Sequence, residues 1–251
     1  MILTQGLIMI EVFERDLKVD ASLTDVNIQF GLLPALTVAQ DNMCEYFRNL
    51  GCDGITMIPI CNCFFVLIKT KIKFYDFVTW LDNIKARTEL VDKSKIRVVV
   101  ETNIESNGKK IATCDHQMCA MDNTERTLRT VASTLMKEEL ETSKECDLTF
   151  DRMSFELTQE DFVTSHKINL SNLDFYKHTN NLQYVQLMMS LLELDFVENV
   201  VVDDFEIHYI AESRINDELL LYKRIEDNKV LFQINRGDSC ITKAVLNYHK
   251  K

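Results

Sequence analysis

The chain has 251 residues with 28 basic and 39 acidic side chains, a formal net charge of −11, and 46% hydrophobic residues. Its 6 glycines and 2 prolines exclude a fibrous chain or a long disordered one, and the excess of negative charge disfavours nucleic acid as a partner. The longest apolar run, Met57 to Ile68, contains a proline and falls well short of the roughly 20 residues that span a bilayer. We therefore expect a globular protein, of one large domain or two ordinary ones, with no membrane segment.

The N-terminus and the cysteines indicate the compartment. A brief apolar stretch from Leu7 to Ile10 is followed by Glu11 and Glu14 and preceded by no basic region, so it is not typical of a signal peptide. The 8 cysteines lie mostly in apolar runs and lack the paired spacing of a zinc site, which favours reduced core thiols over disulfides. We expect a cytoplasmic protein with no metal and no cofactor.

The first half of the chain predicts one helix and several antiparallel strands. A strand at Phe13 to Val19 is followed by a turn at Asp25 to Asn27 and by a helix from Pro34 to Leu50, which Gly51 ends as a C-terminal cap. Further strands are expected at Phe64 to Phe74, Thr79 to Val91, Ile96 to Ile104 and Ile111 to Met121. Asn107-Gly108 supplies a hairpin turn between the last two.

The second half repeats this order of elements. A strand at Phe162 to Leu170 leads into a turn, and a helix begins near Asn180 with apolar residues at three-four spacing as far as Phe196. The remaining strands are expected at Val200 to Tyr209, Glu218 to Glu226, Val230 to Arg236 and Ile241 to His249. A sheet that wraps one long helix, occurring twice, is the tandem (double) hot-dog arrangement, an α+β fold with two antiparallel sheets.

The division into domains follows from composition. Leu135 to Cys146 is rich in Glu, Lys, Ser and Thr, which is typical of an exposed linker, in part helical. We therefore predict an N-terminal hot-dog domain at 1–133, a linker at 134–154 and a C-terminal hot-dog domain at 155–251.

The segment from Asp174 to Tyr184 carries the chemistry. It places an acid, an imidazole and two amides on a turn that opens the second helix. A carboxylate and a histidine beside a helix N-terminus, whose free N–H groups can hold an oxyanion, supply the parts needed to hydrolyse an acyl group. For Asn180 the alternative interpretation is a helix cap, which we favour about two to one.

This part of the chain resembles the second half of acyl-ACP thioesterases, the plant and bacterial enzymes that end fatty-acid synthesis. The residues that carry the resemblance are His166 to Asp174, His178, Asn180, Asn181 and Tyr184. Tyr209 to Arg214, with Asp217 beyond, is similar to the family's strand in which Tyr precedes a catalytic Glu and, in plant members, an adjacent Cys. The first half also fits the family's layout at Phe13, at the helix that ends at Gly51 and at the strand from Ala112 to Met121, with Thr127 to Arg129 after it.

The resemblance implies catalytic roles for Asp174, His178 and Glu212. Tyr176 stands where the family commonly places a catalytic Asn, and we interpret it as a variant that contacts the substrate. Ser213 replaces the plant Cys, which favours direct attack by water over a covalent thiol intermediate.

The same segment is expected to bind the reacting thioester. Either Asp174 or Glu212 would deprotonate the water, and backbone N–H groups near Thr179 to Asn181 would hold the oxyanion. Asn180 and Asn181 would contact the pantetheine arm. The acyl pocket is expected in the first half, near Met43, Phe47, Met57, Phe64 and Phe65.

The predicted partner is acyl carrier protein bearing a fatty acyl-pantetheine thioester, and the predicted reaction releases a free fatty acid. Lys69, Lys71 and Lys73 alternate on one strand face and are expected to be solvated, where they would help an acidic chain approach an acidic partner. Two alternatives stay open: acyl-CoA as the substrate, and a non-catalytic acyl-thioester-binding protein. A tandem chain already contains the paired unit, so both a monomer and a homodimer are compatible with it.

Overall fold

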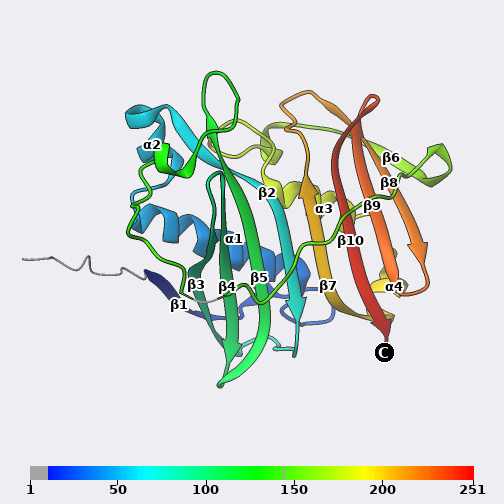
Figure 1. Ribbon diagram of the computed structural model, residues 1–251. Helices are drawn as coiled ribbons and strands as arrows, with labels where there is room; N and C mark the ends of the chain where they lie inside the picture. Colours follow the sequence, from blue (N-terminus) through cyan, green and yellow to red (C-terminus); the bar gives the residue numbers. More distant parts are fainter. Residues whose placement is uncertain (1–10, 144) are drawn as a thin grey trace, which may run out of the picture.

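The computed structural model describes residues 11–143 and 145–251, and its strands form a single antiparallel sheet (Figure 1). The first half contributes β1 (Val12–Lys18), β2 (Cys63–Phe74), β3 (Asn83–Lys93), β4 (Arg97–Ser106) and β5 (Lys109–Asp122). The second half contributes β6 (Phe162–Lys167), β7 (Val200–Tyr209), β8 (Glu218–Glu226), β9 (Lys229–Arg236) and β10 (Ser239–Lys250). Short 3₁₀ turns lie at Ala21–Leu23, Val131–Ser133, Gln159–Asp161 and Leu170–Asn172.

The two halves join edge to edge. The order in the 10-stranded sheet is β1-β3-β4-β5-β2-β7-β10-β9-β8-β6, so β2 and β7 meet at the centre. Their register runs from Lys69 opposite His208 to Lys73 opposite Asp204. The α+β tandem architecture is as predicted, and the two sheets expected from the sequence are continuous with each other through this β2–β7 seam.

The first long helix, α1 (Leu32–Asn49), ends as the sequence predicts. Gly51 has φ +69°, its N–H donates to Arg48 O at 3.0 Å, and the N–H of Cys52 donates to Phe47 O at 2.8 Å. This pair of hydrogen bonds is the Schellman motif, which favours glycine because an L side chain is disfavoured at that φ. The buried face of α1 packs against the first half of the sheet.

A short helix, α2 (Gly54–Cys61), was not predicted from the sequence. Its N-terminus is capped by Asp53, whose Oδ1 accepts a hydrogen bond from Thr56 N–H at 3.1 Å. Asn62, at φ +50°, ends it just before β2. The apolar composition of this stretch is compatible with either a helix or a strand, so the Asp53 cap was the signal that could have identified it.

The second helix is shorter than its apolar spacing predicted. It divides into α3 (Asn181–Met189) and α4 (Leu194–Asn199). Ser190 Oγ donates to Leu187 O at 2.7 Å, and Lys223 Nζ donates to Leu191 O. At the break, therefore, these two backbone carbonyl oxygens accept hydrogen bonds from side chains. The apolar spacing continues to Phe196 because that side chain packs on the same core after the chain has turned.

One core is shared by both halves, and the helices lie on one face of the sheet while the connecting segment crosses the other (Figure 1). Lys71 does not project into solvent as expected, because its Nζ pairs with Asp151 at 2.7 Å and with Glu206 at 2.9 Å. The described part of the segment 134–154 contains no α-helix, and Met136, Leu140 and Leu148 are buried in it. The domain limits stay a prediction, since both the sheet and this core run through the two halves.

The stretch from Leu7 to Ile10 lies outside the described residues; in the rest of the chain no helix is both long and apolar enough to cross a membrane. No disulfide joins the cysteines of the described residues; Cys52, Cys63, Cys114 and Cys119 are buried and Cys44 is exposed.

Candidate active site

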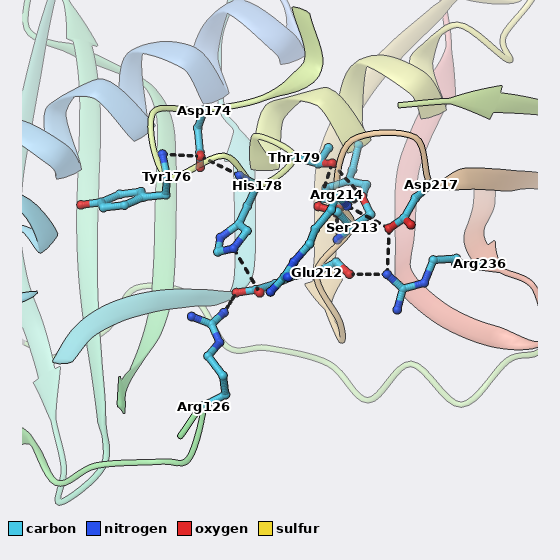
Figure 2. A network of polar contacts seen from close by, with 11 residues as sticks. Arg126, Asp174, Tyr176, His178, Thr179, Glu212, Ser213, Arg214, Asp217 and Arg236 are labelled. Atoms are coloured by element: carbon cyan, nitrogen blue, oxygen red, sulfur yellow. Dashed lines mark hydrogen bonds and ion pairs between the residues drawn. The ribbon is translucent and has the colours of Figure 1, made fainter. Parts of the chain in front are cut away.

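Asp174 organises the turn that precedes α3. Its Oδ1 accepts hydrogen bonds from Tyr176 N–H at 2.8 Å and from His178 N–H at 3.2 Å. Its own N–H donates to His178 O at 2.9 Å, and Lys177 adopts φ +65° to close the turn. The Asp174 carboxylate therefore fixes the backbone from which the His178 side chain projects, as Figure 2 shows.

His178 faces Glu212 across the space between the two loops. Glu212 follows β7, and its Oε2 lies 3.7 Å from His178 Nε2, which is beyond hydrogen-bonding distance but within reach of one small movement. The His178 side chain is 23% exposed and that of Glu212 is 37% exposed, so both can meet a substrate. An imidazole and a carboxylate that face the same partly open space can accept and relay a proton.

Arg126 joins this pair from the other half of the molecule. It lies in the loop after β5, and its guanidinium forms an ion pair with Glu212 Oε1. Arg126 was not predicted from the sequence, although the adjacent Thr127 to Arg129 fits the family's layout. No local pattern predicts this contact, because the two partners are 86 positions apart in the chain.

Ser213 lies next to Glu212 but is fully buried. Its Oγ is 2.7 Å from Thr179 Oγ1 and 2.7 Å from Tyr184 Oη, and its carbonyl accepts the N–H of Thr179 at 3.1 Å. Burial raises the pKa of Tyr184, so this group of hydroxyls stays neutral. The Ser213 cluster links the loop after β7 to the turn before α3 and holds Glu212 opposite His178.

Arg236 of β9 supports the same loop from the other side. Its Nη1 donates to Glu212 O at 3.1 Å and pairs with Asp217 Oδ2 at 2.8 Å. Although burial opposes the shift, the hydrogen bonds from Arg236 and from the N–H of Arg214 lower the pKa of Asp217. The backbone of Glu212 is thus tied down independently of its carboxylate.

Tyr176 points away from His178 and toward the first half (Figure 2). Its ring stacks on Phe64 with centroids 6.2 Å apart and contacts Phe175 at 4.3 Å. Its hydroxyl lies against Gly54, where a Cβ would be 2.1 Å from the hydroxyl oxygen, and burial raises its pKa. The structure therefore places Tyr176 at the junction of the halves, away from the His178–Glu212 pair.

Asn180 caps α3. Its Oδ1 accepts the N–H of Leu182 at 3.0 Å and a weaker bond from Gln40 Nε2 of α1 at 3.4 Å. The N–H groups of Thr179 and Asn180 are bonded to carbonyl oxygens. Of the three N–H groups expected to bind an oxyanion, only that of Asn181 finds no hydrogen-bond acceptor among the described residues.

The structure thus brings His178, Glu212 and the turn of Asp174 together. It directs the side chain of Tyr176 elsewhere and uses that of Asn180 as a cap. Across residues 11–143 and 145–251, no group of three or more His, Cys, Asp or Glu side chains is arranged to hold a metal ion. A carboxylate and an imidazole in this arrangement can transfer protons to and from a water or a substrate.

Two family models match the chain. The model described as the acyl-ACP thioesterase N-terminal domain matches residues 10–138, and that described as the C-terminal domain matches residues 155–249. A search of curated protein sequences finds no match.

Similar solved structures include an acyl-ACP thioesterase from Bacteroides thetaiotaomicron, with a TM-score of 0.82, 14% identity and coverage of 95% of this chain and 98% of that one. Another is the 12:0-ACP thioesterase from Umbellularia californica, with a TM-score of 0.81, 14% identity and coverage of 96% and 98%. At this identity the two structures establish the fold, and the family models carry the assignment.

Proposed function

The chain belongs to the acyl-ACP thioesterase family, and on that premise we propose that Glu212 and His178 form its hydrolytic centre. It is a thioester hydrolase that cleaves fatty acyl-ACP to free fatty acid and ACP, the step that terminates fatty-acid synthesis. The observation that supports the placement of the centre is the approach of His178 Nε2 to within 3.7 Å of Glu212 Oε2 beside the N-terminus of α3.

In the proposed reaction Glu212 accepts a proton from a water molecule, and the oxygen of that water attacks the thioester carbonyl carbon. His178 orients that water and stabilises the Glu212–His178 pair while the pair holds the proton. The carbon–sulfur bond then breaks, the pantetheine sulfur leaves as a thiolate, and the proton held by the pair is returned to it. Asp174 acts as a positioning residue, because its Oδ1 is already committed to the turn that presents His178.

The oxyanion is assigned to the N–H of Asn181 at the first residue of α3. That group points along a helix N-terminus, where the partial positive charge favours a developing anion. A single donor of this kind is typically worth about 3 kcal/mol of barrier. Asn180, as the cap of α3, would orient this donor rather than bind the substrate itself.

The acyl chain is assigned to the first half. Met43, Phe47 and Met57 lie in one buried cluster with Phe65 packed on it. Phe64, the neighbour of Phe65 in the chain, stacks on Tyr176 and lies under the Arg126 guanidinium. We therefore place Tyr176 and Phe64 at the entrance of the acyl pocket, where the predicted substrate contact of Tyr176 would be made.

A thiol-release assay tests the proposed function. Purified protein is given acyl-ACP and acyl-CoA of several chain lengths in parallel, and free thiol is measured over time. We expect turnover of acyl-ACP and a fall in kcat of about 10²- to 10⁴-fold for Glu212→Gln, because the general base is lost. Glu226→Gln, a strand-end carboxylate that pairs with Lys229, is the matched control and should keep the wild-type rate. Full activity of Glu212→Gln would refute the assignment of the base.

The finer predictions on assembly and location are part of the proposal. A monomer would suffice, because both halves contribute to one site through Arg126 and Glu212. A homodimer would leave that site unchanged, and sedimentation equilibrium distinguishes the two states. Fractionation of cells that express the chain tests the expected cytoplasmic location.

A further inference from the structure

We infer that Arg126 is a positioning residue that the first half supplies to the catalytic carboxylate of the second. By holding Glu212 Oε1, its guanidinium directs Oε2 toward His178. The inference rests on the proposed function of Glu212 and extends it, since it makes the hydrolytic centre dependent on contact between the two halves.

The loop that carries Arg126 is built around the carboxylate of Asp122. Asp122 Oδ1 accepts the N–H groups of Thr124 and Glu125, both at 2.9 Å, and these bonds lower the pKa of Asp122. Its Oδ2 pairs with Arg129 at 2.9 Å. Asn62, at the end of α2, donates to Asp122 Oδ1 at 3.3 Å, so the loop is tied to the neighbouring element as well.

Arg126 has an unfavourable backbone conformation in this loop. Its φ is +54°, in the left-handed region that residues with a Cβ rarely adopt, and its N–H donates to Asp122 O at 3.2 Å. Such a conformation persists when the surrounding structure over-determines it, and it is found disproportionately at functional sites. Here it directs the side chain out of the loop and across to Glu212.

The Arg126 guanidinium also forms a cation–π contact. It lies over the ring of Phe64, 5.1 Å from the centroid, and Phe64 in turn stacks on Tyr176. A cation over an aromatic face is attracted by the ring quadrupole, and a planar guanidinium is suited to this contact. Arg126 is therefore fixed at three points: the loop backbone, the Phe64 ring and the Glu212 carboxylate.

Other charged groups reach Glu212 differently. Arg236 of β9 bonds its backbone carbonyl, not its carboxylate, and His178 approaches from the turn before α3. The Glu212 carboxylate also interacts electrostatically with Tyr184 of α3. On its own loop, Arg214 and Asp217 are engaged with each other through the Arg214 N–H. Among the described cations, Arg126 is the one whose ion pair is with the Glu212 carboxylate itself.

Substitution of Arg126 distinguishes positioning from a purely structural contact. For Arg126→Gln we expect kcat on acyl-ACP to fall about 10- to 100-fold with KM within about threefold, because the reacting carboxylate is misplaced. Arg126→Lys should recover only part of the rate, because it restores the charge without the planar fork.

The matched control is Arg87→Gln. Arg87 is in the same half and pairs with Glu89 at 3.1 Å, but on β3. Arg87→Gln should leave kcat on acyl-ACP unchanged. Melting temperatures of all variants show whether they fold. If Arg126→Gln does not fold, Arg126→Lys carries the test, and a kcat equal to that of the wild type would refute the inference.

A double-mutant cycle isolates the route through Glu212. In the Glu212→Gln background, adding Arg126→Gln should lower kcat by less than about twofold, because the group it positions is already gone. The same 10- to 100-fold loss in both backgrounds would overturn the inference. Failure of the wild-type chain to hydrolyse acyl-ACP would instead refute the proposed function, so the two failures are distinguishable.

Discussion

The turn at Asp25 and the turn at Asp174 have the same backbone. Asp25 Oδ1 accepts the N–H groups two and four residues later at 2.8 and 3.1 Å, and Asp174 Oδ1 does so at 2.8 and 3.2 Å. The third residue after each aspartate is left-handed, with φ +63° at Ile28 and +65° at Lys177. Each turn leads into the long helix of its half.

The loop that faces each turn matches as well. In the first half Phe30 N–H donates to Val78 O at 2.9 Å, and in the second Thr179 N–H donates to Ser213 O at 3.1 Å. The residue immediately before the acceptor is a phenylalanine in the first half and Glu212 in the second. The first half therefore has the framework of the active site without its chemistry.

The two turns and the loops that face them differ in a few side chains. Gln29 stands at the place of His178, and Phe77 at the place of Glu212, whereas the aspartate of the turn is present in both. The comparison teaches that this aspartate is required by the turn itself. His178 and Glu212 then distinguish the turn of the proposed active site from the turn at Asp25, which has only a structural role.

The largest expected effect comes from making the second turn resemble the first. His178→Gln should lower kcat about 10²- to 10⁴-fold, the usual contribution of an acid–base group, with little change in the free energy of unfolding. Gln29→His is the matched control and should leave kcat unchanged, because Phe77 offers it no carboxylate. Equal losses in the two variants, measured by thiol release, would break the comparison.

A methyl group tests how closely each turn is packed. In Gly31→Ala the new Cβ would lie 2.3 Å from Asp25 Oδ2, a carboxylate held by the turn, so we expect a loss of about 1–3 kcal/mol in the free energy of unfolding with unchanged kcat. In Gly54→Ala the contact is with the end of the Tyr176 side chain, which can move. That variant should be less destabilised and should show a changed KM, as urea unfolding and steady-state kinetics would reveal.

Removal of each aspartate sharpens the comparison further. Asp25→Ala and Asp174→Ala should each cost about 1–2 kcal/mol of stability, because each leaves two backbone N–H groups without their acceptor. Only Asp174→Ala should also lower kcat, by way of a displaced His178. A loss of activity in Asp25→Ala beyond its loss of folded protein would show that the first turn takes part in catalysis.

The smallest expected effect is a pH dependence of the free energy of unfolding, which arises from Asp217 in the loop that carries Glu212. The pKa of Asp217 is lower in the folded chain than its usual value near 3.9, so its ionised form stabilises the fold above pH about 4, and that contribution is lost as the pH falls through the folded-state pKa. Asp217→Asn should be less stable than the wild type at pH 7, by under about 1 kcal/mol because the pair is partly exposed, and this difference should shrink as the pH falls below about 4. Asp227→Asn, in an exposed turn, should show no such change; a wild-type pH dependence in Asp217→Asn would contradict the assignment.

Features encoded locally could be predicted from the sequence. Gly51 ends a helix and Asn107-Gly108 closes a hairpin because each conformation is a property of the residues themselves. The repeat of elements was visible in the hydrophobic pattern, as was the turn at Asp174. The break after Met189 was not, because apolar spacing records which residues face the core and not whether the chain between them is helical.

Features that depend on distant contacts could not be predicted. Lys71 alternates like a solvated strand residue, and only the fold brings Asp151 and Glu206 to it. The role of Arg126 depends likewise on a partner in the other half. The direction of the Tyr176 side chain follows from a packing contact with Phe64, for which the sequence of the turn contains no signal.

The seam between β2 and β7 has a consequence for how the chain reaches its folded state. A strand in the middle of the sheet has both edges hydrogen-bonded, but if either half were expressed alone, one of these strands would become an open edge able to pair with another chain. The pairing also joins segments more than a hundred residues apart, as Lys69 and His208 are, so it forms late and slowly. During synthesis one edge of β2 has no partner strand until β7 emerges, and we expect the chain to be prone to aggregation in this interval.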